Sequence, residues 1–153
     1  MKKFFLLTAM IIATTTLSSA ITIDDFCGKY SKAQDATVLK LDKNTLAMAM
    51  SLNKVNDIIK QIDEIVIISL ENCSNPGKEN FADDFKMIKD KSYKTFVKNN
   101  EANEKAHILI KENEGLINSM VIISIDEKDC AIVKITGNIA MSSIDSLVGS
   151  MKF

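Results

Sequence analysis

The stretch Leu116–Ile125 reads LINSMVIISI, and after a short polar interval Cys130–Thr136 reads CAIVKIT. Both segments are rich in β-branched residues, which favour strands. The interval between them, Asp126–Asp129, has the length of a hairpin connection, so the two segments are predicted to be antiparallel neighbours. This pair decides the fold, because the rest of the chain has to pack against it.

Two more strand-like segments precede this pair, namely Tyr93–Lys98 (YKTFVK) and Lys105–Lys111 (KAHILIK). The intervals that separate them are again short and polar. Residues 92–137 are therefore predicted to form four consecutive antiparallel strands joined by hairpins. Gly137-Asn138 is expected to end the sheet.

The first half of the chain mixes strands with helices. Ala36–Leu41 (ATVLKL) and Glu64–Leu70 (EIVIISL) are predicted strands, and the second is apolar at both odd and even positions, which is typical of an interior strand. Four helical segments are predicted around them and after the last strand. They are a lead-in over Ile23–Ser31, one or two helices over 44–62 capped by Asp42, a helix that starts at Pro76 and buries Phe81, Phe85 and Ile88, and a final helix with Ile144, Leu147, Val148 and Met151 on one face.

This order of elements indicates an α+β fold. Strands cluster late and helices early, so the sheet is predicted to be mostly antiparallel, a late four-stranded meander plus two earlier strands, with the helices packed on one face. Ala131, Val133 and Ile135 are expected beneath the final helix. Residues 21–153 contain no linker and are predicted to form a single domain.

The first twenty residues have the three parts of a secretory signal peptide. Met1-Lys2-Lys3 is positive, Phe4–Ala13 is mostly apolar, and Thr14–Ala20 is small and polar. Cleavage after Ala20 is predicted, which would place the protein in the periplasm or outside the cell without a stable membrane span. The alternative is an uncleaved anchor, because residues 4–23 carry no charge.

All nineteen basic residues are lysines, and the formal net charge is −1. Nucleic-acid binding needs a concentrated positive field, often with arginine forks, so it is not expected here. Cys27, Cys73 and Cys130 show no metal-ligand spacing, and neither a metal nor another cofactor is predicted. If their strands are antiparallel neighbours, Cys73 and Cys130 would lie close enough for a disulfide, leaving Cys27 as the odd thiol.

His107 is the only histidine, so a hydrolase with a serine or cysteine nucleophile would have to use it as the base. The strand period places it with Lys105, Leu109 and Lys111, on a face expected to be solvated. Asp24-Asp25 and Asp83-Asp84 are expected to be helix surface, because adjacent helical residues point about 100° apart. The methionines are expected to fill the core. No catalytic residues are predicted.

Four stretches together resemble a known family: Tyr30-Ser31, 38–50 (VLKLDKNTLAMAM), 65–69 (IVIIS) and above all 133–147 (VKITGNIAMSSIDSL). They are similar to the domain of unknown function 4252, found in small exported proteins of Bacteroidota. The resemblance implies a fold and a compartment but no catalytic residues, because the family has no established activity.

These observations favour an exported, non-enzymatic envelope domain that binds another envelope protein or a small ligand. A carrier of lipids or other hydrophobic molecules is the first alternative, and a large apolar cavity would favour it. A small hydrolase that uses His107 is the second.

Overall fold

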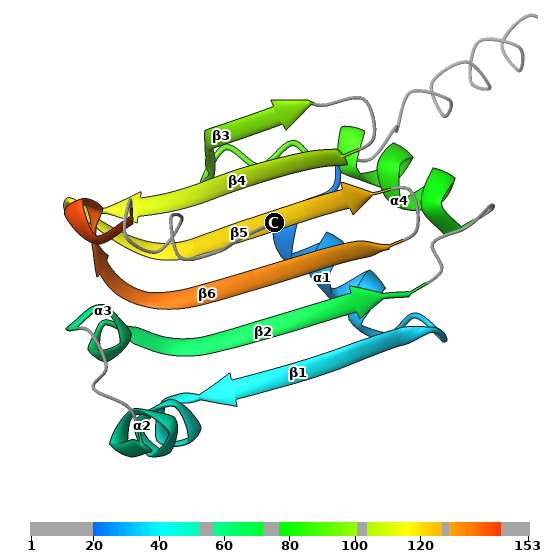
Figure 1. Ribbon diagram of the computed structural model, residues 1–153. Helices are drawn as coiled ribbons and strands as arrows, with labels where there is room; N and C mark the ends of the chain where they lie inside the picture. The colour runs from blue at the N-terminus through cyan, green and yellow to red at the C-terminus, as the bar shows by residue number, and fades with distance from the viewer. Residues whose placement is uncertain (1–19, 53–56, 72–76, 101–103, 127–128, 145–153) are drawn as a thin grey trace, which may run out of the picture.

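The computed structural model describes residues 20–52, 57–71, 77–100, 104–126 and 129–144. These residues form a six-stranded sheet in the order β1-β2-β6-β5-β4-β3, with every neighbouring pair antiparallel (Figure 1). The strands are β1 (Ala36–Asp42), β2 (Ile62–Leu70), β3 (Lys94–Asn100), β4 (Glu104–Asn113), β5 (Leu116–Asp126) and β6 (Cys130–Ala140). The predicted α+β class with a mostly antiparallel sheet is confirmed.

The late meander is confirmed strand by strand, since β3, β4, β5 and β6 pair in sequence order. The β4–β5 hairpin turns at Glu114 and Gly115, whose φ angles are 52° and 77°. Two positive φ angles are what a tight two-residue hairpin turn requires. The alternation of apolar and polar residues, together with the short polar intervals, was sufficient to predict these four strands and their order.

The early strands join the meander at β6. Strand β2 lies between β1 and β6, with Leu70 opposite Cys130, so the prediction of an interior strand is confirmed. Strand β1 forms one edge of the sheet, and its Val38 and Leu39 side chains are 44% and 50% exposed.

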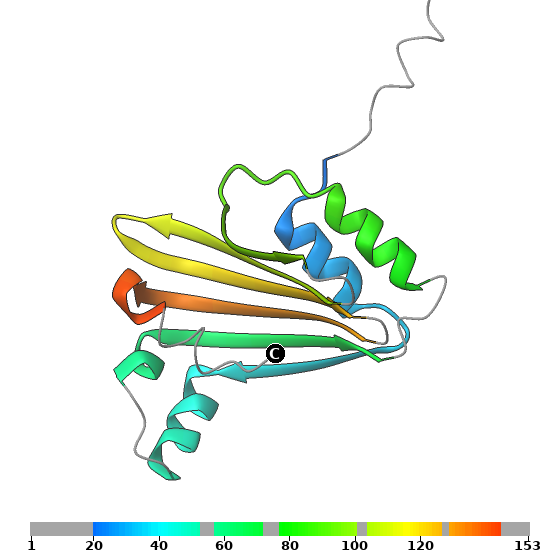
Figure 2. The same ribbon diagram turned by 45° about the horizontal axis from the view of Figure 1, so that its top comes forward.

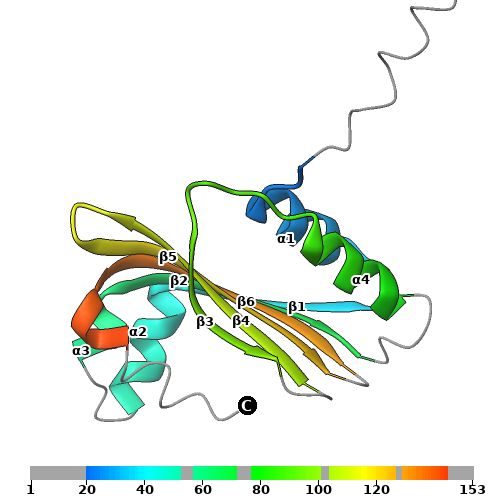
Figure 3. The same ribbon diagram turned by 90° about the horizontal axis from the view of Figure 1, so that it is seen from above.

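The helices lie on both faces of the sheet, which corrects the prediction that they pack on one. Helices α1 (Ile23–Ser31) and α4 (Gly77–Lys86) lie side by side over one face (Figures 2 and 3). Helices α2 (Lys43–Leu52) and α3 (Asp57–Lys60) pack against the other face together with the turn at 141–144. The physical reason is that β5 buries successive residues on both of its faces, so each face needs a cover.

Aromatic rings hold α1 and α4 together. The ring of Phe26 lies 5.0 Å from that of Phe81, and the ring of Tyr30 lies 4.7 Å from Phe81. The Tyr30 hydroxyl donates to Asp84 Oδ2 at 2.7 Å, and Lys29 also pairs with this carboxylate. Phe26 and Phe81 are fully buried, so the two helices form one covering layer.

The opposite face has its own buried cluster, to which Ile135 and Ile144 belong and against which Val133 packs. Ile135 and Val133 thus share a cluster with Ile144 of the predicted final helix. Ala131 belongs to neither buried cluster. Leu147, Val148 and Met151, the rest of the predicted final helix, lie outside the described residues.

Gly137-Asn138 does not end the sheet, because β6 continues to Ala140. The Asn138 N–H donates to the Gln61 carbonyl at 2.9 Å, and the Ala140 N–H donates to Gln61 Oε1 at 2.9 Å. Glycine is required at 137 for close approach rather than for a turn, since an added Cβ would lie 2.1 Å from the Gln61 carbonyl oxygen. The prediction that Gly137 ends the strand is therefore wrong, because Gly137 lies inside β6 and leaves room for the Gln61 carbonyl.

Candidate functional site

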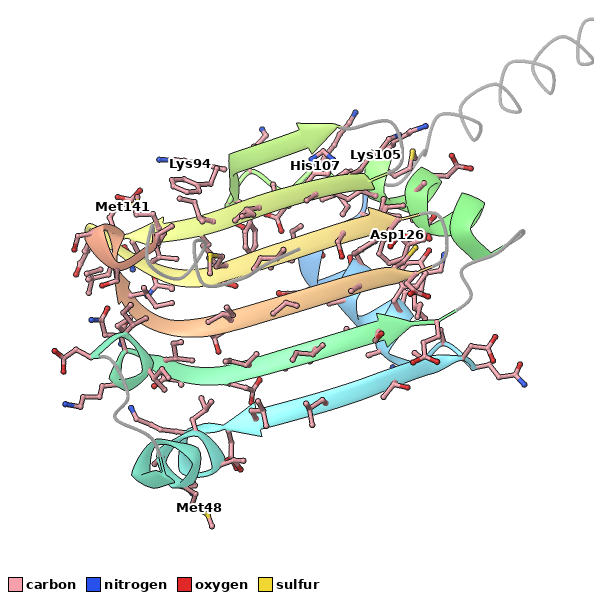
Figure 4. All side chains as sticks on the ribbon, viewed as in Figure 1. Met48, Lys94, Lys105, His107, Asp126 and Met141 are labelled. Atoms are coloured by element: carbon pink, nitrogen blue, oxygen red, sulfur yellow. The ribbon has the colours of Figure 1, made fainter. Side chains whose placement is uncertain are left out.

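His107 is buried, which corrects the prediction of a solvated face. Its side chain points to the same face of β4 as Leu109, as predicted, but only 7% of the residue is exposed. The ring lies 4.5 Å from the ring of Phe85, which α4 brings over this face. Figure 4 shows His107 on β4 beside α4. The alternation of side chains along β4 predicted the correct face for His107. Its burial comes from Phe85 on α4, a helix elsewhere in the chain.

A pocket of about 390 Å³ opens next to His107, between α4, the segment that follows it, and strands β3 and β4. Its volume lies within the range of about 300–1,000 Å³ that is typical of small-molecule sites. The lining residues are Ile23, Phe85, Lys86, Ile88, Asp90, Tyr93, Thr95, His107 and Leu109. The pocket thus combines an apolar wall with a few polar groups.

The Asp90 carboxylate organises one side of the pocket. It accepts the backbone N–H of Ile23 at 3.3 Å and that of Ser92 at 3.0 Å, and also the Ser92 hydroxyl. The hydrogen bonds from Ser92 hold the pKa of the Asp90 carboxyl below its ordinary value, although partial burial acts in the opposite direction. Asp90 therefore remains ionised and holds the backbone of Ile23 and Ser92 in place.

Residues Ile21 and Thr22 complete this side. The Ile21 N–H donates to the Met87 carbonyl at 3.2 Å, and the Lys89 N–H donates to the Ile21 carbonyl at 3.1 Å. Thr22 caps α1 by accepting the Asp25 N–H at 3.1 Å. The segment after α4 is thereby fastened to the start of α1.

Tyr93 lines the pocket, and its hydroxyl is already engaged. It donates to Ser119 Oγ at 2.8 Å, and Ser119 is buried. Burial is the main reason why the pKa of Tyr93 lies above its ordinary value. The Tyr93 hydroxyl therefore stays protonated and serves to join β5 to the segment before β3.

The predicted cysteine pair is only half within the described residues. Cys130 is fully buried at the start of β6, opposite Leu70 at the end of β2, so the expected antiparallel arrangement of these strands is present. Cys73 lies outside the described residues, and the Cys73–Cys130 disulfide stays a prediction. Cys27 is also buried, and burial raises the pKa of its thiol to about 11.

The acidic pairs and the methionines have ordinary surroundings. Asp24 pairs with Lys134 at 2.6 Å, and Asp84 is held by α1 as described above. Met120 fills the core as expected, but Met48, Met87 and Met141 are 72%, 40% and 40% exposed, which corrects the expectation for these three. Within the described ranges, no group of His, Cys, Asp and Glu could hold a metal ion.

Sequence reasoning missed most of this pocket, because its residues come from three separate stretches of the chain. The only local signal was the helical spacing of Phe85 and Ile88, which indicated a buried stripe but no cavity. Asp90 and Thr95 had no distinguishing pattern.

Fold and site together define a small antiparallel α+β domain with a ligand-sized pocket under one pair of helices. Residues 30–147 match the family model described as Domain of unknown function (DUF4252), so the chain belongs to this family and the predicted resemblance is confirmed. The comparison with curated proteins found no match. In the part of the chain that the structure describes, no helix has the length and apolar character needed to cross a membrane.

Proposed function

We propose that this protein is an exported, non-enzymatic binding domain of the cell envelope, and that it takes a small ligand in the pocket beside His107. The observation that carries the proposal is the pocket itself, with about 390 Å³ of space between apolar side chains and a few convergent polar groups. Such a composition is typical of sites that bind small molecules, in which apolar contacts give affinity and polar groups give orientation.

The hydrolase alternative has less support. The His107 ring is packed against Phe85, and the described thiol of Cys27 has a pKa of about 11, which makes it a weak nucleophile. Cys27 also belongs to the buried cluster beneath α1 rather than to the pocket lining. A cysteine–histidine mechanism would need a thiolate in contact with the imidazole.

The carrier alternative also has less support. Each face of the sheet is covered by a buried apolar cluster, whereas a lipid carrier needs a large apolar cavity in such a place. The pocket has Lys86 and Asp90 among its lining residues, and charged groups are costly next to a purely hydrocarbon ligand. A compact ligand with a polar group fits this lining better.

The residues that follow the predicted cut support export. Ala20 is exposed, and the hydrogen bonds of Ile21 to the segment after α4 begin directly behind it. A cut after Ala20 would leave these bonds and the Thr22 cap intact. The hydrogen bonds described at this side of the pocket thus come from residues that the mature chain would keep.

We expect the exported protein to have the mass of a chain that begins at Ile21. Expression of the full chain in a bacterium with a periplasm, followed by intact-mass analysis of the periplasmic or secreted fraction, would measure this. A variant with Ala20→Lys serves as the control, because a charged residue directly before the cut blocks a site that requires small side chains. Mature protein that retains Met1 would instead support the uncleaved anchor.

Filling the pocket is expected to abolish ligand binding. Thr95→Trp would place a large ring in the pocket from edge strand β3, at a position that is already exposed. Native mass spectrometry of the exported protein, incubated with small molecules extracted from the cell envelope, should show a bound mass for the unmodified chain and a loss of at least about tenfold for Thr95→Trp.

Lys94→Trp is the matched control for this experiment. It introduces the same ring at the neighbouring position of β3, which points to the other face of the strand and does not line the pocket. Binding should survive in this variant. Equal binding in all three proteins, or a bound mass in none of them, would contradict a ligand site in this pocket.

A further inference from the structure

The pocket lining contains one group that can pair with an anionic ligand. Lys86 and Asp90 are the two lining residues with full charges, and the Asp90 carboxylate is engaged by Ile23 and Ser92 as described above. Lys86 has no ion-pair partner among the described residues. The Asp90 carboxylate keeps its charge but already accepts three hydrogen bonds from the protein, whereas the Lys86 ammonium pairs with no carboxylate of the described residues.

The groups beside Lys86 suit an anion with an apolar body. The apolar wall consists of Ile23, Phe85, Ile88 and Leu109. Thr95 brings a hydroxyl group to the same space, and the His107 ring, although 7% exposed, still lines it. A carboxylate accepts hydrogen bonds from hydroxyl and ammonium donors, whereas an amine would face Lys86 with a charge of the same sign.

The volume limits the size of such a ligand. A space of about 390 Å³ is near the lower end of the range for small-molecule sites, so it accommodates one ring or a short branched chain rather than a long acyl chain. The centres of the Phe85 and His107 rings lie 4.5 Å apart with the rings tilted by 46°, so the pocket wall offers two aromatic rings against which such a ligand can pack.

We propose that the pocket binds a small amphipathic carboxylate, whose anionic group pairs with Lys86 and whose compact apolar body lies against Phe85, Ile88 and Leu109. This inference rests on the proposed function, because it names the ligand class of the same pocket. It separates the roles of the two charged residues, with Asp90 as a structural group and Lys86 as the group that recognises the ligand.

Three probes with one skeleton test the ligand class, namely phenylpropionate, its neutral amide and phenylpropylamine. Isothermal titration of each into the exported protein should give the tightest binding for the carboxylate. We expect the amide to bind about three- to tenfold more weakly and the amine more weakly still, since an exposed ion pair contributes modestly. Short branched alkyl acids with their amides form a second series, which tests the class independently of the aromatic ring.

Lys86→Gln is expected to weaken carboxylate binding by the same three- to tenfold and to remove the preference over the amide. Lys89→Gln is the matched control, because it removes an equal charge three residues further along, from an exposed side chain that does not line the pocket. It should leave both affinities within about twofold. Circular dichroism of both variants would confirm that they keep the fold.

The outcomes distinguish this inference from the proposed function. Preference for the amine, or equal binding of all three probes with sensitivity to Thr95→Trp, would overturn the carboxylate class and leave a ligand site in the pocket. The same holds if no probe of either series binds while an envelope extract still supplies a ligand that Thr95→Trp excludes. Failure of the probes and of the extract alike would overturn both proposals.

Discussion

Replacing Phe81 with alanine is expected to lower the free energy of unfolding by about 3–5 kcal/mol, as is typical for a buried aromatic ring. Phe81 is fully buried and contacts the rings of Phe26 and Tyr30, so its removal opens a cavity between α4 and α1. Urea denaturation of the protein, followed by circular dichroism, would measure the change. Because α4 also carries Phe85 and Lys86, the affinity of the pocket for the proposed ligand should fall as well.

Phe96→Ala is the matched control for Phe81→Ala. Phe96 lies on edge strand β3 and is 40% exposed, so losing the same ring there should cost at most about 1 kcal/mol. Similar stabilities for the two variants would contradict the view that α1 and α4 form one covering layer through their aromatic contacts.

The second large effect is expected for Gly137→Ala, which should lower the free energy of unfolding by at least about 3 kcal/mol, at the upper end for overpacking. The added Cβ would lie 2.1 Å from the Gln61 carbonyl oxygen and 3.0 Å from the Ile62 Cα. Both are backbone atoms, so the clash cannot be relieved by a change of rotamer. The turn at Gln61 would have to move, with loss of its bonds to Asn138 and Ala140.

Gly28→Ala is expected to change the free energy of unfolding in the opposite direction. Gly28 lies within α1, and a Cβ there would have no atom within 4 Å. Alanine is the better helix former, so this variant should gain about 0.5–1 kcal/mol. Thermal or urea denaturation of both variants would measure the contrast. A Gly137→Ala protein as stable as Gly28→Ala would show that the close contact at Gln61 is not required.

The part of the fold that could be predicted consists of local patterns. The four late strands were found because alternation and hairpin length are set by residues that are neighbours in sequence. The cap at Asp42 was found for the same reason, and its carboxylate accepts the Thr45 N–H at 2.8 Å. The interior position of β2 followed from apolar residues on both of its faces.

The errors concern contacts between distant parts of the chain. His107 was assigned to the correct face of β4, but its burial depends on Phe85 from a helix that precedes it by two elements. Gly137 was predicted to end the sheet, but it is a glycine because the Gln61 backbone lies so close to it. The residues around 137 give no sign of this contact. In both cases the deciding atom belongs to another segment.

The sequence by itself determined the α+β class, the antiparallel meander, the family resemblance and the expectation of export, because each of these depends on composition or on short-range order. Only the tertiary structure decided that helices cover both faces of the sheet and that a pocket forms beneath one pair. Ile23, Asp90 and His107 meet there although they are far apart in the chain. Such a site is a product of packing, since the sheet and the covering helices fix the distances between residues that no sequence period connects.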